Sequence, residues 1–252
     1  MTIGKIVRDR PVPFLYGWML ITLAALWLLP PILQDQDYHH FADQREWLGI
    51  PHFWDVVSNA AFLVVGAIGL LRLRLRHSAT TLVLFGGIFL TGIGSSYYHL
   101  TPNDGTLLWD RLPMTLGFAA IFSAVVQERV DEKAGAMLLW PLLAIGVFSL
   151  LLWHWTGDLR LYAWAQFFPL ITVILVLILF PPKYTGTRYW IAAAVLYALA
   201  KLLEHFDRQV YVFLGALSGH TLKHLAAAAA CFAILRVFLV RQPLDTQEKP
   251  RK

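Results

Sequence analysis

Residues 79–99 read ATTLVLFGGIFLTGIGSSYYH, a stretch of 21 residues that contains no aspartate, glutamate, lysine or arginine. A helix needs about 20 mostly apolar residues to cross the hydrocarbon core of a bilayer. The stretch therefore predicts a membrane-spanning helix. Near its end lie Ser95 and His99, which are four residues apart and so share one face of that helix.

The composition of the whole chain agrees with a lipid environment. Of its 252 residues, 58% are hydrophobic and only 15% are charged, whereas soluble domains have about 25% charged residues. Seven further windows are long and apolar enough to span a membrane. The eight windows are 13–33, 53–73, 79–99, 107–127, 134–154, 160–181, 188–206 and 210–240. They predict an all-α integral membrane protein with eight transmembrane helices and little room for a soluble domain.

The charged residues predict how the chain is oriented. Its net charge is +5, but the basic residues form short clusters between apolar runs, which is not typical of a nucleic-acid-binding surface. Cytoplasmic loops carry the excess of lysine and arginine. With the N-terminus inside, the cytoplasmic clusters are Lys5, Arg8 and Arg10; Arg72, Arg74 and Arg76; Arg129 and Lys133; Lys183 and Arg188; and Arg236, Arg241, Lys249, Arg251 and Lys252. The opposite side has only Arg45, Arg111, Arg160 and Arg208, so we expect both termini in the cytoplasm.

Polar side chains inside the apolar windows are costly in lipid and therefore mark candidate functional sites. In the predicted topology they all fall toward the non-cytoplasmic half of the membrane. They are Asp55, Ser58 and Asn59; Ser95, Ser96 and His99; Asp110 and Arg111; Lys201, Glu204, His205 and Asp207; and Ser218, His220, Lys223 and His224.

The histidines among them suggest a metal site. His220 and His224 are four residues apart, so both imidazoles lie on one helix face and can bind one metal ion, although such a pair alone is more often interior packing. His99 offers a third nitrogen, and three protein ligands plus a water are usual for catalytic zinc. Ser95 and Asp110 reach the same depth, and this convergence favours a site. The single cysteine, Cys231, excludes a cysteine-rich metal site.

Taken together, these segments resemble the alkaline ceramidases. The segments are Phe53-Trp-Asp55-Val-Val-Ser-Asn59, Ser95-Ser-Tyr-Tyr-His99, Asp110-Arg-Leu-Pro-Met114 and Gly219-His220-Thr-Leu-Lys-His224. Alkaline ceramidases belong to a superfamily of seven-helix membrane hydrolases that includes the adiponectin-receptor-like proteins. The resemblance implies a zinc ion held by His99, His220 and His224 with a water as fourth ligand, Asp110 beside that water and Ser95 close by. Residues that we expect to support this site are Asp55, Asn59, Lys201 and Glu204, although Lys201 and Glu204 form a structural ion pair equally well.

The chain departs from this family pattern at its N-terminus. The window 13–33 is an extra helix, which divides the chain into an N-terminal segment with this helix (1–34), an outer loop (35–52), a ceramidase-like transmembrane domain (53–240) and a cytoplasmic tail (241–252). Animal ceramidases place a calcium-binding glutamate just before the Phe-Trp pair. Here His52 occupies that position, which argues against calcium.

The resemblance implies zinc-dependent hydrolysis of the amide bond of a ceramide-like N-acyl lipid to a fatty acid and a sphingoid-type amine. Two other classes of function stay open. A b-type haem protein is disfavoured because the histidine pair lies on a single helix. A receptor or sensor with a structural zinc site is the second alternative, since Ser95 and Asp110 could also serve only to orient ligands.

Overall fold

The computed structural model describes residues 9–73 and 78–244. Its secondary structure is 79% helix, with isolated bridges but no strand in these ranges, which confirms the all-α prediction. Several predicted cytoplasmic basic residues lie outside the described residues, as does the tail from 245 onward. These basic residues are Lys5, Arg8, Arg74, Arg76, Lys249, Arg251 and Lys252.

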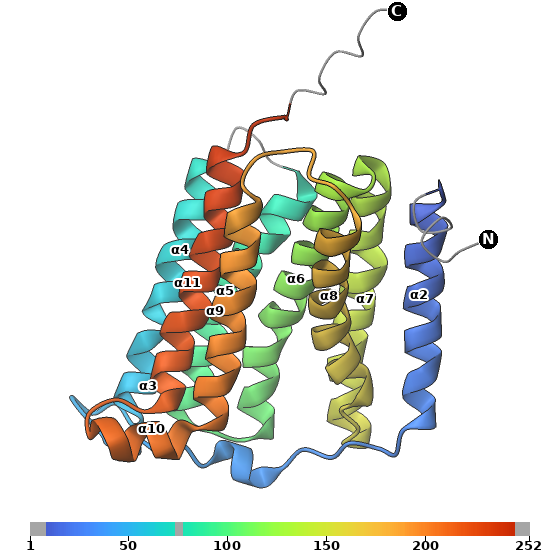
Figure 1. Cartoon of the computed structure of the whole chain (residues 1–252). Coiled ribbons are helices and arrows are strands. Elements are labelled where there is room, and N and C mark those ends of the chain that lie inside the picture. Colours follow the sequence, from blue (N-terminus) through green and yellow to red (C-terminus); the bar gives the residue numbers. More distant parts are fainter. Residues whose placement is uncertain (1–8, 74–77, 245–252) are drawn as a thin grey trace, which may run out of the picture.

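The long helices stand side by side as one bundle, with the extra N-terminal helix at its edge (Figure 1). The helices are α2 (Pro11–Ala25), α3 (Phe53–Ser58), α4 (Ala60–Arg72), α5 (Ala79–Leu100), α6 (Asp104–Arg129), α7 (Glu132–Thr156), α8 (Arg160–Leu179), α9 (Thr187–His205), α10 (Asp207–Leu214) and α11 (Gly219–Val240). Two short 3₁₀ helices, η1 (Leu26–Leu28) and η2 (Gln36–His39), lie between α2 and α3.

Length and composition identify six of the described helical segments as candidate membrane spans, or up to seven if α9 and α10 count as one. Seven of the eight predicted windows correspond to these segments when α9 and α10 are counted as one. The remaining window, 107–127, corresponds to α6, whose apolar composition is diluted by polar residues such as Asp110 and Arg111. With 26 residues, α6 is still about 39 Å long, which is enough to span a bilayer.

The window 210–240 is divided in the structure. Residues 207–214 form the short helix α10, which meets α9 at 82°, and the spanning helix α11 begins only at Gly219. The first window is also shorter than predicted, because its helical part ends at Leu28. Both differences place more of the chain in the polar end of the bundle than the sequence predicted.

Helix α6 lies at the centre of the bundle, packed against α5, α7 and α8, whereas α11 packs on α9 and α4. Pro113 inside α6 has no N–H to donate to the Trp109 carbonyl oxygen four residues earlier. A Cβ at Gly94 of α5 would lie 2.1 Å from that same oxygen. Gly94 therefore allows α5 to approach α6 next to Asp110.

Polar caps fix the start of the helices that form the site. Ser78 and Asn103 form capping boxes with Thr81 and Thr106 at the starts of α5 and α6. Ser218 accepts a hydrogen bond from the Thr221 N–H at the start of α11. Each cap satisfies backbone donors that would otherwise be unpaired.

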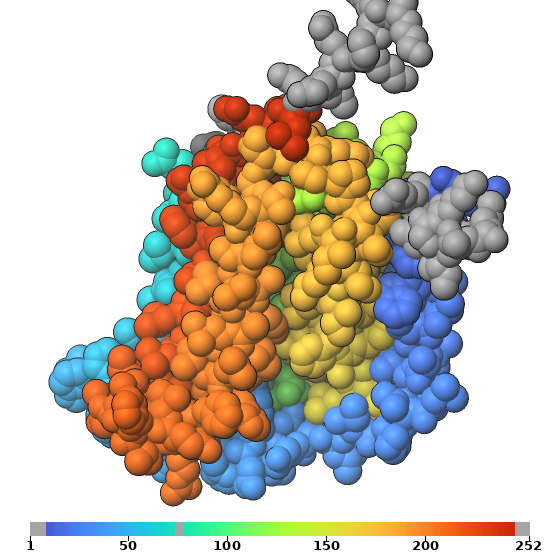
Figure 2. Space-filling view, viewed as in Figure 1, coloured from blue at the N-terminus to red at the C-terminus, as the bar shows by residue number. Residues whose placement is uncertain are grey.

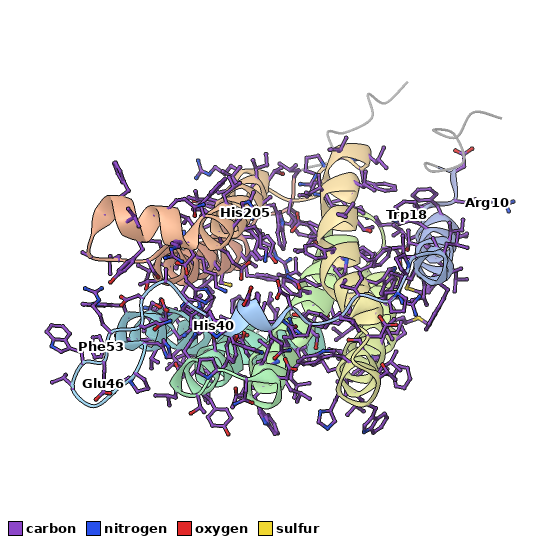
Figure 3. The ribbon with its side chains drawn as sticks, turned by 90° about the horizontal axis from the view of Figure 1, so that it is seen from below. Arg10, Trp18, His40, Glu46, Phe53 and His205 are labelled. Atoms are coloured by element: carbon purple, nitrogen blue, oxygen red, sulfur yellow. The ribbon has the colours of Figure 1, made fainter. Side chains whose placement is uncertain are left out.

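The connection from α2 to α3 crosses one end of the bundle, with His40 near the middle and Glu46 and Phe53 at the far edge (Figure 3). Its start is fastened by Asp158 and Arg160. Asp158 accepts from the Ile32 N–H at 3.4 Å, and Arg160 donates to the Leu29 carbonyl oxygen at 2.7 Å. The N-terminal end of α2 and the C-terminal end of α11 lie at the opposite end (Figure 1).

Candidate functional site

Three buried histidines from two helices meet at the end of the bundle covered by the α2–α3 connection. His99 belongs to the last turn of α5, and His220 and His224 to the first two turns of α11; their exposed fractions are 1%, 4% and 4%. One ring nitrogen of each lies within 4.8 Å of the others. The structure therefore brings together the three residues that were predicted as metal ligands.

The spacing of two of the three donors fits a zinc ion. Two nitrogens bound to tetrahedral zinc at about 2.0–2.1 Å are separated by about 3.3–3.4 Å, and the Nε2 atoms of His99 and His220 lie 3.3 Å apart. The Nδ1 atom of His99 has no hydrogen-bond partner among the described residues. The Nε2 atom of His99 has only the Nε2 atom of His220 within hydrogen-bond distance among these residues, and binding a cation would satisfy both nitrogens.

Ser58 of α3 orients His224. Its hydroxyl oxygen lies 2.8 Å from the Nδ1 atom of His224 and 3.1 Å from the Asp55 carbonyl oxygen. The single hydroxyl proton is donated to the carbonyl oxygen, so the Ser58 oxygen accepts from an Nδ1–H. This tautomer leaves the lone pair of His224 on Nε2, which is then free to bind a metal.

Two carboxylates hold the start of α11 in place. Asp55, which is fully buried, accepts hydrogen bonds from Ser218 at 3.2 Å and Thr221 at 2.6 Å. Asp207 accepts from the backbone N–H of His220 at 2.7 Å. The Asp55 carboxylate therefore supports the histidine pair through the start of α11, and the Asp55 backbone carbonyl oxygen lies beside His224.

Asn59 lies beside Asp55 and donates to the Asp55 carbonyl oxygen at 2.8 Å. The side-chain oxygen Oδ1 of Asn59 and the Oδ2 atom of Asp55 are buried without a partner among the described residues. Buried polar atoms without partners are rare. Those of the described chain are Asp55 Oδ2, Asn59 Oδ1, His99 Nδ1 and Arg111 Nη1, and all four belong to the site or its surroundings.

Asp110 and Ser95 lie together on the wall of a cavity of about 500 Å³ that also reaches His224. Asp110 is 9% exposed, and the Ser95 hydroxyl lies beside its carboxylate. Burial of an acidic group beside a hydroxyl is unfavourable for packing alone. The arrangement suits proton transfer inside the cavity.

An ion cluster forms another part of the cavity wall. Glu204 accepts from Lys223 at 2.6 Å and is also paired with Lys201 on its own helix. The Tyr38 hydroxyl donates to Glu204 at 3.3 Å and connects the cluster to η2. The structural ion pair that the sequence left open is therefore present, although these side chains also face the cavity.

The connection between α2 and α3 covers the histidines. The ring of Phe41, 4% exposed, lies 4.6 Å from the ring of His99 and 4.5 Å from that of His220, measured between centroids. His52 donates from Nδ1 to the His99 carbonyl oxygen at 2.9 Å. Phe41 was not predicted as part of the site; the sequence marks it only as one of three aromatic residues, with Tyr38 and Trp47, in the polar loop 35–52.

The geometry defines a helical membrane protein with a buried three-histidine site beside a large cavity. A family model described as ceramidase matches residues 49–200, which is more than half of the chain, and the chain therefore belongs to the ceramidase family. The match includes His99 and Asp110 but ends before His220 and His224. A search of curated proteins found no match.

Proposed function

We propose that this protein is a zinc-dependent membrane amidase that cleaves ceramide-like N-acyl lipids to a fatty acid and a sphingoid-type amine. The observation that carries the proposal is the cluster of three histidines, one of which, His224, lines a cavity that also presents Asp110 and Ser95. Membership of the ceramidase family supports the amide bond as the target.

The shape of the cavity supports a lipid substrate. From the polar end it runs between α6, α8, α9 and α11 to apolar residues such as Leu170, Val173 and Ile234. Helix α9 packs on α11, whereas α8 packs on α6 and α7. A seam therefore lies between α8 and α9, bridged by the hydrogen bond from Gln166 to Tyr197, and atoms of α6 are visible within it (Figure 2). An acyl chain could enter here from the bilayer without passing through water.

A zinc ion held by His99, His220 and His224 would supply a Lewis acid and an activated water. Asp110 acts as general base on the attacking water and passes the proton to the leaving amine. Ser95 donates a hydrogen bond to the oxygen of the scissile carbonyl as negative charge develops there. The cavity wall holds the acyl chain so that the amide lies between these two side chains.

A receptor with a structural zinc site is the alternative. Structural zinc sites are closed by four protein ligands, whereas catalytic sites keep one position open. The described residues offer three ligands beside a cavity of about 500 Å³, which favours catalysis.

Hydrolysis of a ceramide labelled in its acyl chain tests the proposal. We expect the wild type to release labelled fatty acid, and Asp110→Asn to lose about 100-fold or more in kcat while retaining its metal. The matched control is Asp104→Asn, which removes a half-exposed carboxylate from the start of the same helix. A fully active Asp110→Asn enzyme would show that Asp110 is not the general base. Wild-type protein that binds zinc but does not hydrolyse the lipid would favour the receptor.

We also propose on which side of the membrane the site lies. The described ends of α2 and α11 lie at one end of the bundle and the histidines at the other. Combined with the distribution of lysine and arginine, this supports cytoplasmic termini and a site facing the non-cytoplasmic half of the bilayer.

A further inference from the structure

Arg111 is a buried cation without a carboxylate partner in the part of the chain that the structure describes. It follows Asp110 in α6 and is 7% exposed. Its Nη2 donates to the Gln34 side-chain oxygen at 2.8 Å, but its Nη1 is buried with no partner among these residues. A buried charge is costly unless it is paired and fully hydrogen-bonded.

Aromatic rings hold Arg111 in place without neutralising it. Its guanidinium carbon lies 4.5 Å from the ring centroid of Trp153 and 4.7 Å from that of Tyr162. Cation–π contacts offset part of the cost of burial and fix the plane of the guanidinium. The second buried arginine of α6, Arg129, differs in having Glu128, the Phe180 carbonyl oxygen and the Thr187 hydroxyl as partners.

Arg111 lies on the wall of the same cavity as the proposed catalytic residues. Its guanidinium carbon is 5.7 Å from the ring of Tyr38, which places it at the end covered by the α2–α3 connection. The other two cations on the wall, Lys201 and Lys223, share Glu204. Of these three cavity cations, Arg111 is therefore the one that forms no ion pair among the described residues.

We propose that Arg111 binds an oxyanion, a carboxylate or a phosphate, in the head group of the lipid substrate. The guanidinium fork matches both groups. The inference rests on the proposed function, because the scissile amide would lie at Asp110, the adjacent residue. An acyl chain in the apolar part of the cavity leaves the polar end for the head group. The enzyme would then select N-acyl lipids with an anionic head group over neutral ones.

Binding of matched amphiphiles tests this selection. N-palmitoylglycine and N-palmitoylethanolamine share an acyl chain and amide but differ in a carboxylate, and N-palmitoyl phosphoethanolamine adds a phosphate arm. Binding is measured in the Asp110→Asn background, so that the amide stays intact. We expect one or both anionic ligands to bind about 10-fold to 100-fold more tightly than the neutral one, the range of a charge-assisted hydrogen bond. Arg111→Gln removes the preference, and Arg111→Lys, which keeps the charge but not the fork, retains part of it.

Lys201→Gln is the control for charge. It removes the same formal charge from the same cavity, but from a cation that already has Glu204 as partner. The proposal would be overturned if the Asp110→Asn protein bound anionic and neutral ligands equally. It would also be overturned if Lys201→Gln lost the preference as fully as Arg111→Gln does. Hydrolysis by wild type is measured separately. If the lipid is cleaved but Arg111 has no effect on the preference for anionic ligands, only this inference is refuted. If anionic ligands are preferred but no lipid is cleaved, only the proposed amidase activity is refuted.

Discussion

Removal of the Ser58 hydroxyl should weaken metal binding without removing a ligand. In Ser58→Ala, the Nδ1–H of His224 loses the acceptor at 2.8 Å in a site where Ser58 itself is only 8% exposed. An unsatisfied buried donor costs about 1–3 kcal/mol. Without metal, the ring escapes this cost by turning or by carrying its proton on Nε2, but with metal on Nε2 it cannot. The cost therefore falls on the bound state, and we expect the Kd for zinc to rise about 10-fold to 100-fold.

Competition with a chromophoric chelator measures this Kd in detergent solution. Ser149→Ala is the matched control, because Ser149 is also fully buried but donates only to the Gly146 carbonyl oxygen in its own helix. Ser58→Thr should restore most of the affinity, since the hydroxyl is kept. If Ser58→Ala binds zinc as tightly as wild type while Ser149→Ala does the same, Ser58 does not orient His224 and the proposed tautomer is wrong.

Three further predictions concern packing, the N-terminal connection and orientation. Gly94→Ala should lower the stability of the bundle by about 1–3 kcal/mol, seen as a lower Tm, because the new Cβ would meet the Trp109 carbonyl oxygen; an unchanged Tm would show that α5 and α6 can separate freely. Burial opposes ionisation of Asp158, but hydrogen bonds from Arg160 and from backbone N–H groups outweigh it and hold its pKa below the ordinary 3.8. Because a lowered pKa stabilises the fold only while the group is ionised, the Tm advantage of wild type over Asp158→Asn should be full above about pH 5 and should be lost as the pH falls below 3.8 through the lowered pKa; a constant difference would contradict this. A reporter fused after residue 252 should be active only as a cytoplasmic reporter, and activity on the opposite side would reverse the predicted topology.

Hydropathy predicted the helical membrane fold because each spanning helix must form its backbone hydrogen bonds within itself in lipid. A spanning helix is therefore visible in the sequence as one continuous apolar stretch. Hydropathy did not predict α10, because its apolar residues 210–214 are continuous with the apolar window that contains α11. The break at residues 215–218 is made by Gly215, which ends α10 with a φ of 66°, and by Ser218, which caps α11.

The candidate metal ligands could also be predicted from the sequence. The pair His220 and His224 has a helical spacing, and His99 stands out as a polar residue at the end of an apolar helix. The contact between Ser58 and His224, by contrast, joins residues 166 positions apart. Nothing in the local sequence encodes which buried hydroxyl meets which imidazole, so such partners could not be predicted without the packing of α3 on α11.

The loop over the site was predicted only as polar. Its polar residues are present, but Phe41 turns inward against two histidine rings and Tyr38 bonds Glu204. These contacts depend on where the connection crosses the end of the bundle, which is set by its anchors at Asp158 and Arg160. Long-range anchoring of this kind leaves no periodic signal in the sequence.

The most direct test of the central claim is the metal content of the protein, by elemental analysis after purification in detergent, for wild type and His220→Ala. We predict one zinc per wild-type chain and little or none in the variant, because two imidazoles alone hold zinc weakly. Ser149→Ala, purified in parallel, should keep its zinc. Wild-type protein without zinc, or zinc that persists in His220→Ala, would contradict the site formed by His99, His220 and His224.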